Sequence, residues 1–559
     1  MQAEKNYIPF TRVPLPDRTW PEKTITKPPV WCSVDLRDGN QALITPMGIE
    51  EKLKFFHTLT DCGFKEIEVG FPSASDTEYE VLRTLIEGGH IPDDVWIQVL
   101  VQAREELIRK TFEAVRGAKN VIIHFYNSTS TLQRKVVFGK DERGITDIAV
   151  AGARLIRELT EAETADSDMN IRYEYSPESF TGTEIDFSVS ICEAVMEELG
   201  ATEENPVILN LPSTVEMSTP NTYADQIEYF CRHLKNRAAA IISLHPHNDR
   251  GCGVASAELG LMAGADRLEG TLFGNGERTG NLDLVTVALN MFTQGIDPQL
   301  DFSNILELKH VYEQCTGMRV PERQPYVGEL AFTAFSGSHQ DAIRKGYEYM
   351  QNSGTKFWEV PYLPINPADL RRQYEPVIRI NSQSGKGGAA YVLEQALGYR
   401  LPKEMHPEFG AMVKNAADTF GDELSREQIV EIFRREYVEL TGKYKLLSYR
   451  FTEMKDAERT GCRFDGSLLI NGSEYQLTGS GNGPIDSFFQ AISALGLGGY
   501  SFINYHEHSI AGGSDAKGIC YIELQRPDGR HIFGAGIHAN INVAALLGIL
   551  CAVNRAEQE

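Results

Sequence analysis

Apolar and polar residues alternate with two periods along the first 300 residues. Short runs rich in β-branched and aromatic residues are typical of buried strands. Each run is followed by a longer stretch whose apolar residues recur every three or four positions, as in an amphipathic helix. In the first such stretch Ile49, Leu53, Phe56 and Leu59 fall on one helical face. The pattern therefore predicts repeated β-then-α units.

Eight strands are predicted, each followed by a helix. They are residues 30–36, 65–71, 96–101, 120–126, 170–176, 206–212, 240–246 and 266–272. Eight units over roughly 270 residues match the size and order of a (β/α)₈ barrel. A doubly wound open sheet uses the same units and is the alternative. It more commonly has about five to seven strands, so the count favours the barrel.

The pattern changes after residue 302. Residues 303–440 are predicted to be a linker of loops and small helical subdomains. Within 441–559, three predicted strands precede a helix at 484–495, and three more precede a helix at 540–556. A βββα unit that occurs twice is an internal repeat. The predicted fold class is therefore an α/β barrel at 30–302, helical linker subdomains, and a separate C-terminal α+β domain of two βββα units.

The N-terminal segment and the cysteines indicate where the protein works. Residues 1–29 hold six prolines within the first 29 positions, which predicts an extended arm. No apolar stretch approaches the ~18 residues that span a bilayer, and no apolar signal core starts the chain. The nine cysteines form no CxxC pair. These features predict a cytoplasmic protein with free thiols and no membrane partner.

The charge of the chain limits its ligands. Lys and Arg number 54 and Asp and Glu number 78, which gives a formal charge of −24. A surface of this sign repels phosphate backbones, so we expect no nucleic-acid partner. A small anionic substrate needs a local cation or a metal ion.

Reactive side chains follow six of the eight predicted strands, where the strands of a barrel meet at one rim. His245 and His247 carry the most specific signal, because residues i and i+2 of a strand point to the same side. With Asp38, after the first strand, they offer two nitrogens and an oxygen to a divalent ion such as Zn²⁺ or Mn²⁺. The alternative is that the two histidines only form hydrogen bonds in the barrel mouth. The same spacing at 506–508, outside the barrel, is interpreted as a solvated strand edge.

Other rim residues have both a functional and a structural interpretation. Arg37 provides a cation that would stabilise an oxyanion, or it pairs with a carboxylate such as Glu68 or Glu178. Glu178 would transfer a proton or hold Arg37. Thr214 would bind a substrate carboxylate or cap the next helix. The glycine-rich segments 274–280 and 385–388 lack the spacing of nucleotide-binding motifs and are interpreted as tight turns.

Several motifs together resemble the acyl-CoA-condensing metalloenzymes built on a TIM barrel, which include isopropylmalate, homocitrate and citramalate synthases. The motifs are LRDGNQ at 36–41, HPHND at 245–249 and GNGERTGN at 274–281. Longer segments are similar to the large-form 2-isopropylmalate synthases of leucine biosynthesis. They are YSPESFTGT at 175–183, LPSTVEM at 211–217, SGSHQD at 336–341 and VPYLPI at 360–365. The resemblance covers almost the whole chain.

The resemblance implies a role for individual residues. Asp38, His245 and His247 match metal ligands, with Asn281 near the ion and a possible fourth ligand. Arg37 matches the residue that assists the reacting carbonyl. The oxo-acid pocket is implied to contain His124, Tyr126, Ser176, Glu178 and Thr214.

The resemblance also implies a homodimer and a leucine effector. His339 and Tyr362 match positions that cover the active site of the partner subunit. The C-terminal repeat is similar to a leucine-binding regulatory domain. Its expected contact residues are Gly481, Asn482, Gly483, Pro484, Gly512 and Asp515.

The implied reaction joins acetyl-CoA to 3-methyl-2-oxobutanoate with a divalent ion, Mg²⁺, Mn²⁺ or Zn²⁺, as Lewis acid. His339 is our choice of base, relayed through water and oriented by Glu178. Citramalate or homocitrate synthesis is the nearest alternative, because only the pocket for the oxo-acid side chain differs. A hydroxymethylglutaryl-type lyase would leave the C-terminal repeat unexplained. A non-catalytic amino-acid sensor is a further alternative, against which the intact set of Asp38, His245, His247 and Arg37 argues.

Overall fold

The computed structural model describes residues 6–334, 336–374, 388–420, 424–440, 442–456, 459–497, 499–510 and 516–558. The chain divides into two compact units. The first unit comprises residues 1–332 and 364–374, and the second comprises residues 333–363 and 375–559. None of the described helices is both long and apolar enough to cross a bilayer.

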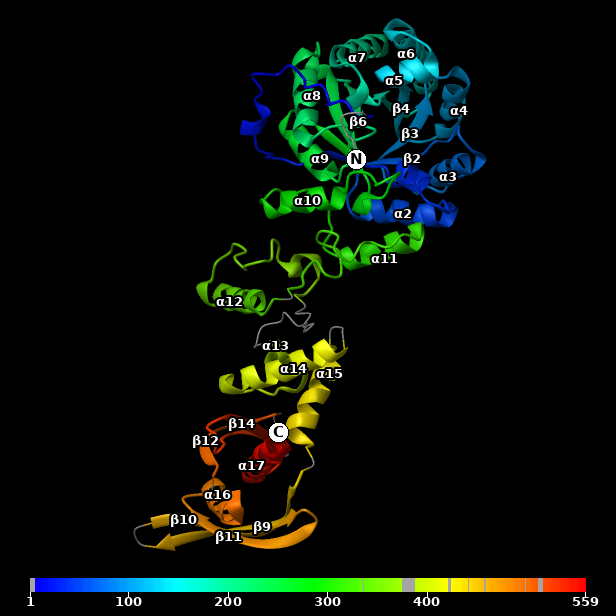
Figure 1. The fold of residues 1–559 in the computed structure, drawn as a ribbon. Helices are drawn as coiled ribbons and strands as arrows, with labels where there is room; N and C mark the ends of the chain where they lie inside the picture. Colours follow the sequence, from blue (N-terminus) through cyan, green and yellow to red (C-terminus); the bar gives the residue numbers. More distant parts are fainter. Residues whose placement is uncertain are drawn as a thin grey trace. The chain divides into compact units, whose positions relative to one another are not determined.

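The first unit is a closed barrel of eight parallel strands surrounded by helices (Figure 1). β1 pairs with both β2 and β8, which closes the barrel. The strands are β1 Val30–Ser33, β2 Glu66–Gly70, β3 Trp96–Gln102, β4 Asn120–Ser128, β5 Asn170–Glu178, β6 Val207–Ser213, β7 Ala240–Pro246 and β8 Arg267–Gly270. The helices are α2 Ile49–Asp61, α3 Asp76–Glu87, α4 Glu105–Val115, α5 Thr131–Gln133, α6 Glu142–Thr164, α7 Ile185–Leu199, α8 Pro220–His233, α9 Gly253–Met262, α10 Leu284–Thr293 and α11 Ile305–Thr316. The predicted barrel is confirmed, and the open-sheet alternative is wrong.

Charged side chains fill part of the barrel interior. Arg267 is fully buried, and its guanidinium lies 2.6 Å from Glu66 and 2.7 Å from Glu269. Glu66 and Glu68 are two positions apart in β2, as are Arg267 and Glu269 in β8, so each pair points to one side of its strand. The barrel is therefore held from within by ion pairs between strands as well as by apolar packing.

The first strand is shorter than predicted. β1 ends at Ser33, and Asp35–Gly39 forms a π-helical turn, η2. The carbonyl of Val34 accepts the N–H groups of Arg37, Asp38 and Gly39, which bends the chain out of the sheet. The carboxylate of Asp35 accepts the N–H of Leu272 and holds this turn against the loop after β8. The turn places Arg37 and Asp38 over the barrel mouth.

Residues 7–29 run along the outside of the barrel in largely extended form, with a 3₁₀ turn at Trp20–Glu22. Two carboxylates of α8 hold this arm. Glu228 accepts the N–H groups of Thr19 and Trp20, and Asp225 accepts the indole N–H of Trp20 at 2.8 Å. The arm is therefore anchored through buried polar contacts.

The second unit contains the helical subdomains and the C-terminal repeat. Its helices are α12 Gly337–Ser353, α13 Gly388–Leu397, α14 His406–Phe420, α15 Arg426–Phe433, α16 Pro484–Ile492 and α17 Ile541–Gln558. Its strands are β9 Tyr444–Asp456, β10 Arg459–Ile470, β11 Ser473–Gly481, β12 Ser501–Ser509, β13 Gly518–Gln525 and β14 His531–His538. They form two antiparallel three-stranded sheets. Helices α13 to α15 share a hydrophobic core with β13 and β14.

The βββα unit is present twice, as predicted. In each copy the third strand packs a glycine against the helix that follows it. A Cβ at Gly479 of β11 would lie 2.3 Å from the carbonyl oxygen of Ser487 in α16. One at Gly534 of β14 would lie 2.2 Å from that of Gly548 in α17. Both helices then pack into one common core.

Candidate active site

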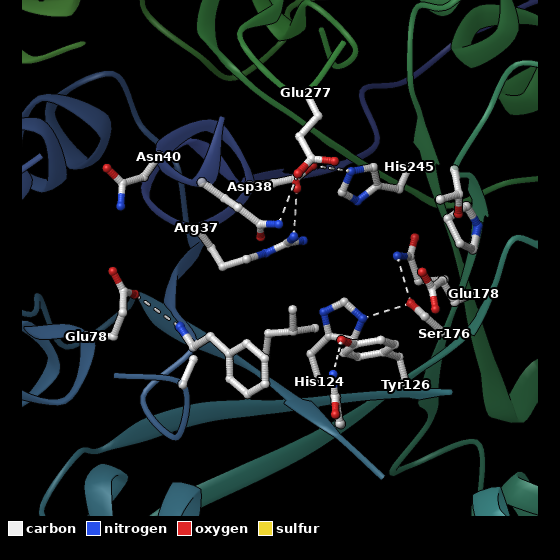
Figure 2. Close-up of a pocket in the computed structure, with 18 of the residues that line it drawn as sticks. Arg37, Asp38, Asn40, Glu78, His124, Tyr126, Ser176, Glu178, His245 and Glu277 are labelled. Carbon is white, nitrogen blue, oxygen red and sulfur yellow. Dashed lines mark hydrogen bonds and ion pairs between the residues drawn. The ribbon is translucent and has the colours of Figure 1, made fainter. Parts of the chain in front are cut away.

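The barrel mouth holds a cavity of about 700 Å³, lined entirely by residues of the first unit. Figure 2 shows Arg37, Asp38, His124, Ser176 and His245 directed toward it. Tyr126, Glu178, Thr214 and His247 also line the cavity. The structure therefore brings together the rim residues that the sequence pointed to.

Asp38, His245 and His247 converge on one point. Their ligand atoms all lie within 4.8 Å of one another, and all three residues are buried. Asp38 Oδ2 lies 3.2 Å from His245 Nε2 and 3.6 Å from His247 Nε2. Two ligand atoms that are each ~2.1 Å from an ion lie about 3.0–3.4 Å apart. The geometry of the three groups therefore fits a divalent cation.

Neighbouring groups orient these ligand atoms. His245 Nδ1 lies 2.8 Å from Glu269, which directs Nε2 at Asp38, as a carboxylate commonly does for a metal-bound histidine. Asn281 donates its amide N–H to Asp38 Oδ2 at 2.9 Å, and its Oδ1 lies 3.1 Å from His245 Nε2. Asn281 is thus part of the same cluster, within reach of an ion.

The cluster favours positive charge between its carboxylates. Burial opposes ionisation of Asp38, but Arg37 and His245 hold the pKa of its carboxyl well below the usual range. Burial also opposes protonation of His245, yet hydrogen bonds to Asp38 and Glu269 raise its pKa to about 10. Burial and the neighbouring His245 lower the pKa of His247 to about 4. A bound cation would take the place of the proton on His245.

A chain of hydrogen bonds links Arg37 to the floor of the cavity. The Nε–H of Arg37 donates to Glu68, and its Nη1 lies 2.8 Å from Asp38. The other oxygen of Glu68 lies 2.6 Å from His124 Nδ1, and His124 Nε2 lies 2.8 Å from Ser176 Oγ. Glu68 is therefore the structural partner of Arg37 that the sequence suggested. The Arg37 side chain nevertheless lines the cavity.

Glu178, Tyr126 and Thr214 are placed by local contacts. Ser128 donates its hydroxyl to Glu178, and the described acids that pair with Arg37 are Asp38 and Glu68, not Glu178. Gln102 donates to the Tyr126 hydroxyl at 3.0 Å. Thr214 Oγ1 accepts the N–H of Ser179 at 3.0 Å, and the cap of α8 is Thr219. The helix-cap interpretation of Thr214 is therefore wrong.

A second buried cluster consists of His124, Glu174 and Glu269. The positive charge that balances its carboxylates comes from Arg267. Arg267 lies 3.3 Å from Glu174 and 2.7 Å from Glu269. Burial and the neighbouring Glu269 raise the pKa of Glu174 well above its usual range. We interpret this cluster as part of the barrel interior and not as a metal site.

The glycine-rich loop after β8 is a tight turn, as its sequence indicated. Gly280 has a φ of 101°, and a Cβ there would lie 2.0 Å from the carbonyl oxygen of Gly274. The Asn281 N–H donates to that same carbonyl at 3.0 Å. The turn presents the Asn281 side chain to Asp38 and His245.

The remaining predicted residues belong to the second unit. The rings of His339 and Tyr362 stack with centroids 4.0 Å apart, and Tyr362 has a φ of 65°. At the start of α16, whose N-cap is Gly483, the Asn482 N–H donates to Asp486 at 2.8 Å. Gly512 and Asp515 lie outside the described residues.

Sequence reasoning missed several polar residues inside the strands. Asn210 of β6 lines the cavity and donates its amide N–H to Ser176 at 3.0 Å. Gln98 of β3 donates to Glu68 and to Glu269. The available signal was a charged or amide residue within an otherwise apolar strand, as at Glu68, Gln98, Asn210, Arg267 and Glu269.

Three family models match successive parts of the chain. Residues 28–311 match a family model described as HMGL-like, residues 329–394 match the alpha-isopropylmalate synthase post-catalytic domain-like model, and residues 423–557 match the LeuA allosteric (dimerisation) domain. The 2-isopropylmalate synthase of Clostridium acetobutylicum is 53% identical, over 99% of each chain. That of Rhodospirillum rubrum is 54% identical, also over 99% of each chain. A hydroxymethylglutaryl-CoA lyase structure from Pseudomonas aeruginosa has a TM-score of 0.43 at 15% identity, over 53% of this chain and 95% of that chain.

The barrel and the residues at its mouth define an HMGL-like barrel enzyme. Within this class, the chain belongs to the family of 2-isopropylmalate synthases, and it carries that family's allosteric domain.

Glu269→Gln tests how the candidate metal centre is held. The change removes the carboxylate that orients His245. We expect affinity for Mn²⁺ to fall about 10–100-fold, the usual effect of losing such a partner. Titration calorimetry measures the affinity, and thermal unfolding shows that the variant is folded. Asp225→Asn, which changes a buried carboxylate at the N-terminal arm, is the control. Unchanged Mn²⁺ affinity in folded Glu269→Gln protein would contradict the assignment.

Proposed function

We propose that this chain condenses acetyl-CoA with 3-methyl-2-oxobutanoate and water to give 2-isopropylmalate and free CoA. The observation that carries the proposal is the cluster of Asp38, His245 and His247 beside Arg37 in the barrel cavity. Identity of 53% over the full length to a 2-isopropylmalate synthase supports the choice of substrates.

The cavity residues have complementary parts in this reaction. Asp38, His245 and His247 would hold a divalent ion, which would supply Lewis-acid polarisation of the oxo-acid carbonyl. Arg37 stabilises the carbonyl oxygen as negative charge develops on that oxygen. The ion pair with Glu68 keeps the guanidinium of Arg37 in place. The oxo acid binds at the cavity floor to Ser176 and His124, which contact each other. Ser176 accepts a hydrogen bond from the Asn210 amide. Tyr126 and Thr214 complete the pocket.

The proton of the acetyl methyl group needs a base. We assign this role to His339, acting through water and oriented by Glu178, with Tyr362 beside it. His339 and Tyr362 are stacked in the second unit, whereas Glu178 lines the barrel cavity. In the proposed homodimer, one subunit provides the barrel and its partner provides His339 and Tyr362.

We propose a catalytic domain at 30–302, a linker at 303–440 and a leucine-binding regulatory domain at 441–559. The allosteric family model spans 423–557, which agrees with a regulatory C-terminal part. Gly481, Asn482, Gly483 and Pro484 precede α16 and are the proposed leucine contacts. The carboxylate of Asp486 accepts the Asn482 N–H, and we propose that it also receives the ammonium group of the bound leucine.

Free CoA released from acetyl-CoA measures the reaction directly. We expect release with 3-methyl-2-oxobutanoate to exceed release with pyruvate or 2-oxoglutarate by at least about 10-fold in kcat/KM, because the alkyl pocket distinguishes methylene groups. Chelation should abolish the activity, and Mn²⁺ or Mg²⁺ should restore it. Preference for pyruvate or 2-oxoglutarate would indicate citramalate or homocitrate synthesis. No release with any oxo acid would favour a non-catalytic sensor.

Mixed dimers test the shared active site. Arg37→Ala and His339→Ala subunits should each be inactive as homodimers. A hybrid of the two has one site with both defects and one with neither, so remixing the subunits should recover activity. Native mass spectrometry confirms that hybrids form. Absence of recovery in confirmed hybrids would contradict a composite site.

Gly483→Val tests the proposed leucine site. No atom lies within 4 Å of a Cβ at Gly483, so the fold accommodates the new side chain, which instead fills the space before α16. We expect full condensation activity but at least about 10-fold weaker inhibition by leucine, because the added alkyl group occupies the ligand's volume. Gln476→Val, at an exposed position of β11, is the control. Unaltered leucine inhibition of the Gly483→Val enzyme would contradict the site.

A further inference from the structure

A buried lysine adjoins the cavity. Lys52, in the first turn of α2, is 1% exposed, although lysine is rarely buried unless it is paired. Its Nζ lies 2.5 Å from Glu78 Oε1. In the described part of the chain, Glu78 is the one acid within ion-pair distance of this ammonium group. None of the catalytic steps above uses either residue.

Glu78 organises the loop between β2 and α3. Its Oε2 accepts the N–H of Phe71 at 3.2 Å, and its own N–H donates to Ser75 Oγ at 3.2 Å. Inside the loop, the Ala74 N–H donates to the Phe71 carbonyl at 2.9 Å. One glutamate therefore holds both ends of the 71–75 loop, and Lys52 holds the glutamate.

The end of β2 is shaped to admit this carboxylate. A Cβ at Gly70 would lie 2.2 Å from Glu78 Oε2 and 3.9 Å from Lys52 Nζ. A side chain at position 70 would push the pair away from the strand. The ion pair thus packs directly against the carboxyl end of a barrel strand, where the cavity begins.

The loop forms an apolar part of the cavity wall. Phe71 and Ala74 line the cavity with Met47 and Leu100, beside Ser75, Thr77 and Glu78 of the same segment. Figure 2 shows Glu78 well separated from Ser176 and Glu178, with its carboxylate directed at a backbone N–H. An alkyl group that reached this side of the cavity would meet the apolar side chains of Phe71 and Ala74.

We propose that Lys52 and Glu78 are positioning residues that fix the 71–75 loop as the apolar wall of the cavity and thereby set which alkyl group the oxo acid carries. The inference rests on the proposed condensation. Without the ammonium group, the carboxylate of Glu78, whose side chain is 18% exposed, turns toward the cavity water. Phe71 then loses its acceptor and the wall moves.

Lys52→Met tests the proposal, because methionine keeps the length and apolar stem of the side chain and removes the charge. We expect kcat/KM for 3-methyl-2-oxobutanoate relative to pyruvate to fall about 10-fold, the value of one or two methylene contacts. The loss should arise in KM, with kcat and Mn²⁺ affinity nearly unchanged. Glu78→Gln keeps an oxygen for the Phe71 N–H and should give a smaller loss. Lys52→Met/Glu78→Gln leaves no unpaired carboxylate and should recover part of the selectivity.

Lys65→Met is the matched control, because Lys65 pairs with Asp94 at the surface and its side chain is 57% exposed. Three results would overturn the proposal: unchanged selectivity in a folded Lys52→Met or Glu78→Gln enzyme; an equal fall in kcat for every oxo acid; or failure of both single variants to fold. The last would show that the pair supports the barrel and not the wall. If the unmodified enzyme releases no CoA with any oxo acid, the proposed function fails first, and this inference fails with it.

Discussion

The site depends on charges that the barrel buries in pairs. Arg267, fully buried, pairs with Glu66 and Glu269, and Glu269 in turn orients His245. Removing one partner of such a buried pair typically costs about 3–5 kcal/mol, because it leaves the other charge without compensation. Contacts between side chains of neighbouring strands therefore fix the direction of the His245 imidazole. Rigid strands therefore hold the side chains at the barrel rim in fixed positions.

Arg37 is held in the same manner. Glu68, in the middle of β2, accepts from Arg37 on one oxygen and contacts His124 with the other. A guanidinium fixed in this way does not have to reorganise when charge develops on a substrate oxygen, which is how preorganised groups lower a barrier. The chain as a whole carries a formal charge of −24, but Arg37 and an ion held beside it would reverse the local field and attract a substrate anion.

The second unit contains the part of the chain that matches an allosteric dimerisation domain. Its two βββα repeats share one core in which α16 and α17 both take part. A ligand bound at the proposed site before α16 would therefore change contacts that belong to both repeats. The family match to an allosteric dimerisation domain agrees with an effector acting through such a domain.

Periodicity along the sequence predicted the barrel and the C-terminal repeat because each strand or helix buries a patterned face. It also brought His245 and His247 together, since residues two apart in a strand share a side. It failed for β1, where three N–H groups converge on the carbonyl of Val34 and end the strand early. It failed also for Asn210 and Gln98, whose roles come from partners on other strands. Side-chain contacts between strands form only when the barrel closes, so the sequence of one strand does not predict them.

In the proposed reaction, catalysis depends on an ion bound by Asp38, His245 and His247. Anomalous diffraction at the manganese edge, from crystals grown with Mn²⁺ and 3-methyl-2-oxobutanoate, locates that ion. We expect one strong peak about 2.1 Å from an oxygen of Asp38 and from a ring nitrogen of each histidine, with the oxo acid beside it. A cavity without a peak, or a manganese ion bound by other residues of the chain, would contradict this assignment.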